Sequence, residues 1–331
     1  MIRLPAALRR VSILVAVLPF WASGIAMADA GRKVAVTFDD LPIVSQSPFS
    51  DAALEDLTAR LVSAISAREI PAVGFVNEMR LYDDSVLNPD RVALLGQWLE
   101  AGLALGNHTY SHPDLHRVTL QAFQADVLRG EAVTRPLLGK YGRQLTWFRH
   151  PFLHTGTKLE TKHAFESFLT EHGYRVAPVT IDNSEWIFAR AFDIAMREGD
   201  RALAVRIGED YVAYMLRMFA FYEAQAEAIL GRRIPHVLLL HANQLNAHWF
   251  GPLADRLAVR QYSFVSLEAA LDDPAYDSAD AYTGPGGITW LHRWAITAGV
   301  DRRVFRGEPE TPPYILELTG LREHYYPSES E

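Results

Sequence analysis

The sequence predicts an α/β protein built on a mostly parallel sheet. Apolar runs such as "KVAVTF" (33–38) and "HVLLLH" (236–241) have the composition of buried strands. Segments of helical periodicity lie between such runs, and residues 52–65 are an example. This alternation indicates βαβ units. About seven strands of this kind could close a barrel or form an open doubly wound sheet, and periodicity alone does not choose between them.

The expected elements follow one another along the chain. The remaining strands are predicted at 72–76, 103–107, 145–150, 174–181 and 262–267. Helices are predicted at 52–65, 91–102, 120–138 and 158–173. Gly102 and Gly173 end two of these helices, since glycine is the usual residue just beyond a helix C-terminus.

Two regions depart from the alternation of short strands and helices. Residues of about 188–234 have helical character and are longer than a single crossover helix requires, so we expect a helical insertion. A lid and a long packing helix are both compatible with this pattern. The last part, 273–331, is rich in turn residues and aromatics, and it is predicted to be an extension packed on the same domain.

The first thirty residues have the layout of a secretory signal peptide. Arg3, Arg9 and Arg10 precede an apolar run, and the small residues of "AMADAG" follow it. We therefore predict a signal peptide at 1–30 and an exported protein of the periplasm or extracellular space. The short run and Pro19 argue against a membrane span, so no stable membrane anchor is expected after cleavage.

Composition excludes several kinds of site. The chain has no cysteine, so disulfides and thiolate metal sites are impossible. The net charge is −8 and no basic cluster occurs, which makes nucleic acid an unsuitable partner.

Polar residues that suit a metal site follow two of the predicted strands. Asp39 and Asp40 end the first strand in "TFDD", and His108 and His112 follow the strand at 103–107 in "HTYSH". The carboxyl ends of parallel strands meet at one edge of a sheet, so these residues are expected to lie close together. Two histidines and one carboxylate leave coordination positions open, as catalytic metal sites require.

Five short stretches at successive strand ends resemble those of a known family. They are "TFDD", "HTYSH", "FRHPF", "DNSEW" and "LLLH". In this order they are similar to the polysaccharide deacetylase family, also called the NodB-homology domain or carbohydrate esterase family 4. The resemblance covers roughly residues 33–270. It implies a distorted (β/α) barrel of about seven strands, here a catalytic domain at 31–272.

The resemblance also implies roles for the reacting groups. Asp39 corresponds to the catalytic base, and Asp40, His108 and His112 correspond to the ligands of one divalent metal ion. Zinc is the first candidate for this ion, with cobalt, nickel or manganese as alternatives. His241 corresponds to the general acid.

Supporting roles follow from the same stretches. Arg149 corresponds to the arginine that orients the base, and Asp182 to an acid that pairs with this arginine. Phe152, Trp186 and Leu239 are expected to bind substrate, with Trp186 as an apolar wall and Leu239 in the acetyl pocket. The family usually has tyrosine where Phe152 stands, so a hydroxyl is lost here. The fourth stretch matches the family only loosely.

Together these features predict an exported, metal-dependent deacetylase. It would hydrolyse N-acetyl groups of amino-sugar poly- or oligosaccharides of the peptidoglycan or chitin type, using metal-activated water. The same site could instead hydrolyse an O-acetyl ester or a small non-sugar amide. A carbohydrate-binding protein without catalysis and a non-haem iron oxygenase are further alternatives. The joint presence of both aspartates, both histidines, Arg149 and His241 disfavours the binding protein, and the second aspartate and the β/α alternation disfavour the oxygenase.

Overall fold

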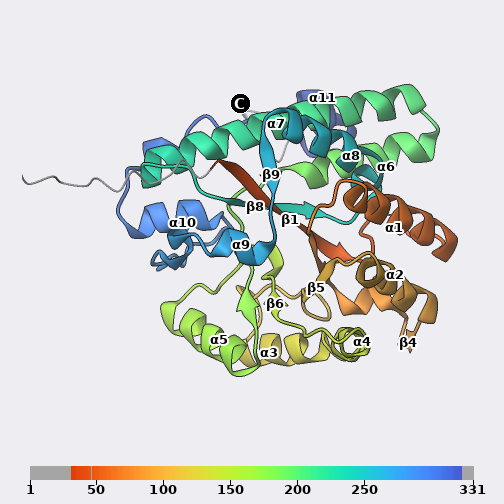
Figure 1. The fold of residues 1–331 in the computed structure, drawn as a ribbon, viewed down its shortest axis with the longest axis horizontal. Coiled ribbons are helices and arrows are strands. Elements are labelled where there is room, and N and C mark those ends of the chain that lie inside the picture. Colours follow the sequence, from red (N-terminus) through yellow and green to blue (C-terminus); the bar gives the residue numbers. More distant parts are fainter. Residues whose placement is uncertain (1–30, 46, 323–331) are drawn as a thin grey trace, which may run out of the picture.

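A curled parallel sheet is the centre of the molecule (Figure 1). The computed structural model describes residues 31–45 and 47–322, so the predicted signal peptide at 1–30 lies outside the described residues. The strands are β1 (Arg32–Leu41), β2 (Val73–Val76), β5 (Ala104–Asn107), β6 (Trp147–Phe148), β7 (Arg175–Val176), β8 (His236–His241) and β9 (Tyr262–Phe264). Their order is β7-β6-β5-β2-β1-β8, and β9 pairs with the start of β1.

Backbone contacts bring the two ends of this order together. The chain beyond β7 turns to β8, where Ile181 forms a parallel bridge with Leu238. The backbone N–H of Leu239 donates to the carbonyl of Ile181 at 3.1 Å. The predicted distorted (β/α) barrel is therefore confirmed, and the open doubly wound sheet is not formed.

Helices cover the outside of the curled sheet. They are α1 (Asp51–Ser66), α2 (Pro89–Glu100), α3 (Leu120–Arg129), α4 (Thr134–Lys140), α5 (Leu159–Glu171), α6 (Glu185–Glu198), α7 (Arg201–Leu230), α8 (Gln244–Val259), α9 (Leu267–Leu271), α10 (Trp290–Thr297) and α11 (Pro313–Leu318). Short 3-10 turns lie at Glu78–Leu81, Pro151–Leu153, Pro274–Asp277 and Arg302–Phe305, and β3 (Tyr82–Asp83) and β4 (Val86–Leu87) form a small hairpin. Figure 1 shows α6, α7 and α8 on one side of the sheet and α3, α4 and α5 on the opposite side.

The long segment of helical character folds as a helical hairpin. Gly199 ends α6 with a left-handed φ of 73°, which glycine adopts without steric cost. Asp200 then caps α7, because its side chain accepts the backbone N–H of Leu203 at 2.9 Å. Both helices pack on α8, so this hairpin is part of the globular core.

Some predicted boundaries were wrong. The helix expected at 120–138 is two helices, α3 and α4, separated at 130–133. Gly130 lies there against the backbone of Thr109, where a Cβ would be only 2.4 Å from the carbonyl carbon. The strand expected at 174–181 pairs with β6 only at Arg175 and Val176 before it bends towards β8.

Alternation along β1 sends successive side chains to different cores. Val34, Val36 and Phe38 belong to the large core beneath the helices. Ala35 belongs to a smaller cluster contributed by β1, β2, β6 and β8, which fills the inner face of the sheet. Asp39 has the same parity as Ala35, so its carboxylate lies at the inner face, at the carboxyl end of the strand.

No helix within residues 31–45 and 47–322 is long and apolar enough to cross a bilayer.

Two glycine substitutions test the packing of α7 on α8. A Cβ at Gly208 would lie 1.8 Å from Cε2 of Trp249, whereas nothing lies within 4 Å of a Cβ at Gly139 in α4. Gly208→Ala should lower the free energy of unfolding by about 1–3 kcal/mol through overpacking. Gly139→Ala should raise it by about 0.5–1 kcal/mol, as alanine does in an exposed helix. Urea unfolding measures both values, and a stabilised Gly208→Ala protein would contradict the close packing.

Candidate active site

One cavity collects the residues that follow the strands. It has a volume of about 550 Å³. Nine of the ten predicted site residues line it: Asp39, Asp40, His108, His112, Phe152, Asp182, Trp186, Leu239 and His241. The tenth, Arg149, is fully buried behind them. The strands therefore bring the predicted residues together, while their chemical roles stay predictions.

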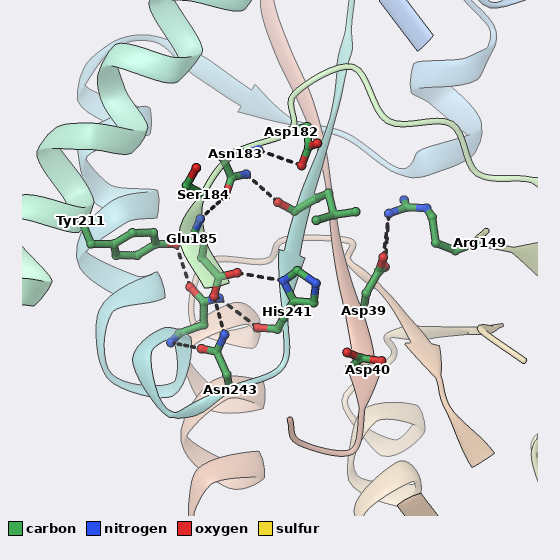
Figure 2. Close-up of polar contacts among 12 residues, drawn as sticks. Asp39, Asp40, Arg149, Asp182, Asn183, Ser184, Glu185, Tyr211, His241 and Asn243 are labelled. Carbon is green, nitrogen blue, oxygen red and sulfur yellow. Dashed lines mark hydrogen bonds and ion pairs between the residues drawn. The ribbon is translucent and has the colours of Figure 1, made fainter. Parts of the chain in front are cut away.

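Asp39 is held by a buried arginine. Nη1 of Arg149 lies 3.2 Å from each carboxylate oxygen of Asp39. Figure 2 shows the two side chains facing one another. The same guanidinium donates to Oγ1 of Thr37 at 2.9 Å and to the carbonyl of Ala177 at 2.9 Å. A buried charge requires such partners, since leaving it unpaired would cost several kcal/mol. Asp39 is thus held in one orientation at the cavity wall.

The neighbouring carboxylate is placed differently. Asp40 has a φ of 65°, a left-handed conformation that is uncommon outside glycine, so the chain turns at this residue. Oδ1 of Asp40 is buried and has no hydrogen-bond partner among the described residues. Nη2 of Arg80 lies 3.7 Å from its other oxygen. Burial raises the pKa of Asp40. The charges of Arg80 and the nearby histidines outweigh this effect and lower the pKa to about 2.

His108 and His112 each place a ring nitrogen near the carboxylate of Asp40. Nδ1 of His108 lies 2.9 Å from the carbonyl of Arg149, which can only accept, so the contact selects the neutral tautomer whose lone pair is on Nε2. His112 has a φ of 57°, and its ring lies against that of His108 with centroids 4.8 Å apart. Burial, reinforced by His108, lowers the pKa of His112 to about 4, so this imidazole is neutral near pH 7.

These three residues fit a divalent metal ion. Asp40, His108 and His112 each offer a ligand atom, and these atoms lie within 4.8 Å of one another. Nε2 of His108 is nearly equidistant from the two aspartates, at 3.9 Å from Asp39 and 4.0 Å from Asp40. The distances alone do not choose the ligand. Both oxygens of Asp39 already accept from Arg149, whereas Oδ1 of Asp40 has no hydrogen-bond partner within 31–45 and 47–322, so Asp40 is the better ligand.

A second Asp-His-His group lies nearby but does not suit a metal. Asp114, His116 and His154 also have ligand atoms within 4.8 Å of one another. The rings of His116 and His154 are stacked 3.8 Å apart at an angle of 4°. An imidazole lone pair lies in the ring plane, so two parallel rings cannot both direct lone pairs at one ion. Nδ1 of His154 lies 2.6 Å from Asp114, as expected for a hydrogen-bonded pair.

His241 faces Asp39 from the adjacent strand. The two residues are partners in the register of β1 and β8, so their side chains lie on the same face. Nδ1 of His241 lies 2.9 Å from Oε2 of Glu185 (Figure 2). Burial alone would lower the pKa of His241, but the hydrogen bond and charge of Glu185 raise it to about 9. The imidazolium therefore persists at neutral pH.

Glu185 is the site residue that sequence reasoning missed. Its side chain is 1% exposed, and its other oxygen accepts from the amides of Asn243 and Asn246. It stands in the stretch "DNSEW", three residues after Asp182, and begins α6. An acid in the first turn of a helix, next to a predicted site residue, was the available signal.

The expected pairing of Asp182 with Arg149 is not found among the described residues. Asp182 accepts the backbone N–H of Asn183 at 2.8 Å, and Arg149 is bonded to Asp39, Thr37 and Ala177 instead. Asp182 acts on Arg149 only through its charge. Burial raises the pKa of Asp182. The bend after β7 explains the difference, because it takes Asp182 beyond Ala177, whose carbonyl accepts the arginine.

Three predicted substrate-binding residues form apolar parts of the wall. Phe152 has a φ of 56° and is 54% exposed, and its ring centroid lies 4.5 Å from that of His112. Trp186 is 42% exposed at the start of α6, so a large aromatic surface faces the cavity. Leu239 is nearly buried at the floor. This combination suits a sugar ring and a small acyl group.

Comparisons with known proteins agree with these features. Residues 27–176 match the family model described as polysaccharide deacetylase. A peptidoglycan-N-acetylglucosamine deacetylase of Bacillus cereus is 24% identical over 173 residues, which are 51% of this chain and 53% of that protein. The chain thus spans about half the length of this curated relative.

Two solved structures of carbohydrate esterase family 4 resemble part of this chain at low sequence identity. A family 4 carbohydrate esterase from Streptomyces lividans, in complex with acetate, has a TM-score of 0.45 and 18% identity, covering 73% of this chain and 97% of that one. A CE4 family pseudoenzyme from Bacillus anthracis has a TM-score of 0.42 and 10% identity, covering 73% and 66%.

The matched residues contain β1, β2, β5 and β6, and with them Asp39, Asp40, His108, His112 and Arg149. Through this part, which is somewhat less than half of the chain, the protein is similar to the polysaccharide deacetylase family.

Proposed function

We propose that this protein is an exported, metal-dependent deacetylase that removes N-acetyl groups from amino-sugar poly- or oligosaccharides. One observation carries the proposal: two adjacent carboxylates line the same cavity in different surroundings. Asp39 is hydrogen-bonded to Arg149, and Asp40, beside two histidines, has one oxygen without a hydrogen-bond partner in the described part of the chain. One carboxylate is thus suited to proton transfer and the other to metal binding. Export is part of the proposal and rests on the sequence of residues 1–30.

Asp40, His108 and His112 would hold the metal. The chemistry that a divalent ion bound by these residues would supply is polarisation of the acetyl carbonyl and a lowered pKa of a water molecule. Asp39 accepts a proton from the attacking water molecule while the oxygen of that water forms a bond to the carbonyl carbon. His241, whose pKa is raised to about 9, gives a proton to the nitrogen as the C–N bond breaks. The products are acetate and a free amine. Trp186 and Phe152 would flank the sugar and exclude water from one side.

Acetate release tests the proposed reaction. We expect the metal-loaded protein to release acetate from N-acetylglucosamine oligomers or peptidoglycan fragments. Treatment with a chelator should abolish release, and added Zn²⁺ should restore it. Release that is insensitive to the chelator would contradict metal dependence. Release only from O-acetylated sugars would replace the amide by an ester as the substrate.

Substitution of Asp39 and substitution of Asp40 should affect turnover and metal binding differently. Asp39→Asn should lower kcat by roughly 10²–10⁴-fold, the usual contribution of a general base, and should retain one metal ion per chain. Asp40→Asn should lose the metal, because it removes a charged ligand. Metal content by mass spectrometry and acetate release distinguish the variants. The opposite result, with metal lost only from Asp39→Asn, would exchange the two roles.

Glu185 should set the alkaline limit of activity. The pKa of His241 is raised from 6.5 to about 9, so the protonated acid is present at neutral pH and is lost as pH rises through 9. Glu185→Gln removes the charge that raises this pKa. We expect the alkaline limb of kcat/KM to move towards pH 6.5, while Glu209→Gln, an exposed change on α7, leaves it in place. An unmoved limb in Glu185→Gln would contradict the role of the pair.

A further inference from the structure

A second, smaller hollow opens beside the reaction cavity. Its volume is about 120 Å³, against about 550 Å³ for the main cavity. Both are lined by Asp40, Trp186 and His241, so the hollow begins at the groups that would react. A substrate held in the main cavity would extend a neighbouring group into it.

The helix α6 supplies a cation to this hollow. Arg190 lies four residues after Trp186, so both side chains leave the same face of the helix, and both line the hollow. No hydrogen bond or ion pair of Arg190 occurs with any residue of 31–45 or 47–322. The other arginines at the site differ in this respect, because Arg149 is bonded to Asp39 and Arg80 lies beside Asp40.

A guanidinium in a hollow, without a hydrogen-bond or ion-pair partner among the described residues, is suited to the recognition of an anion. Its planar fork matches a carboxylate in two parallel hydrogen bonds, and such charge-assisted bonds are stronger than neutral ones. Asp193 lines the same hollow and has polar interactions of its own. On a chain of net charge −8, a local cation would make this hollow more attractive to an anionic group.

We propose that Arg190 binds a carboxylate of the substrate, on the sugar unit next to the one that loses its acetyl group. The preferred substrates are then amino-sugar oligomers or polymers that carry carboxylates. Two sources share this chemistry: the free carboxylate of a lactyl group on a peptidoglycan sugar and the carboxylate of a uronic acid. The inference rests on the proposed deacetylase function, since it names the substrate class of the same site.

Kinetics on matched substrates test the inference. Neutral N-acetylglucosamine oligomers are compared with peptidoglycan saccharides whose lactyl carboxylate is free, with the same saccharides after amidation, and with oligomers that contain a uronic acid. Arg190→Gln should raise KM for the carboxylate substrates by roughly tenfold, the loss expected for a charged hydrogen bond, and change the neutral ones less than about twofold. Arg190→Lys should retain part of the preference for carboxylate substrates over neutral ones. Arg217→Gln, an exposed change on α7, should behave as wild type.

The results separate this inference from the proposed function. Lactyl and uronic acid substrates that respond differently identify the source of the carboxylate. Equal KM values of the wild-type protein for free and amidated saccharides, or equal losses on neutral and anionic substrates in Arg190→Gln, would overturn the inference.

Binding provides a readout that does not need turnover. If no substrate releases acetate, the proposed function fails, and calorimetry on metal-loaded Asp39→Asn still tests Arg190. Tighter binding of the carboxylate saccharides, lost in the double variant with Arg190→Gln, supports the inference. Equal binding of both saccharides contradicts it.

Discussion

The buried pair of Arg149 and Asp39 is the interaction on which the rest of the site depends. The guanidinium is fully buried and bonds to β1 through Asp39 and Thr37, and to the chain after β7 through Ala177. Its own backbone carbonyl accepts from His108, which follows β5. One residue at the end of β6 thus orients both the proposed base and a proposed metal ligand. Losing either partner would leave a buried charge or a misdirected imidazole.

Backbone strain accompanies this arrangement. Asp40, Thr109, His112 and Phe152 all have left-handed φ values, between 56° and 67°. Conformations of this kind are costly for residues other than glycine and persist where the surrounding structure enforces them. Here they turn side chains from three different strand ends into one cavity. At Asp40 the turn also separates two carboxylates that adjoin in sequence, so one can contact Arg149 while the other keeps an oxygen free.

The helical hairpin of α6 and α7 forms part of the active site. Glu185, Trp186 and Arg190 lie in the first two turns of α6. Trp186 lines both the cavity and the smaller hollow, and Arg190 lines the hollow. Glu185 itself is buried and bonded to His241 and to the two asparagines at the start of α8. The first residue of this hairpin therefore supplies the carboxylate that raises the pKa of His241. Because the same helix carries Trp186 and Arg190, a change in this hairpin would alter the proposed recognition of substrate as well.

The sequence by itself determined the alternation of strands and helices and the presence of Asp39, Asp40, His108, His112 and His241 at strand ends. These are local properties, since apolar runs and polar residues at their ends are visible without the fold. Only the tertiary structure decided barrel closure through Ile181, the separation of α3 from α4 at Gly130, and the partner of each charge. Asp182 and Glu185 stand three residues apart, yet only the latter reaches His241. Such choices depend on where a bend or helix turn points a side chain, and this is set by packing between segments far apart in the chain.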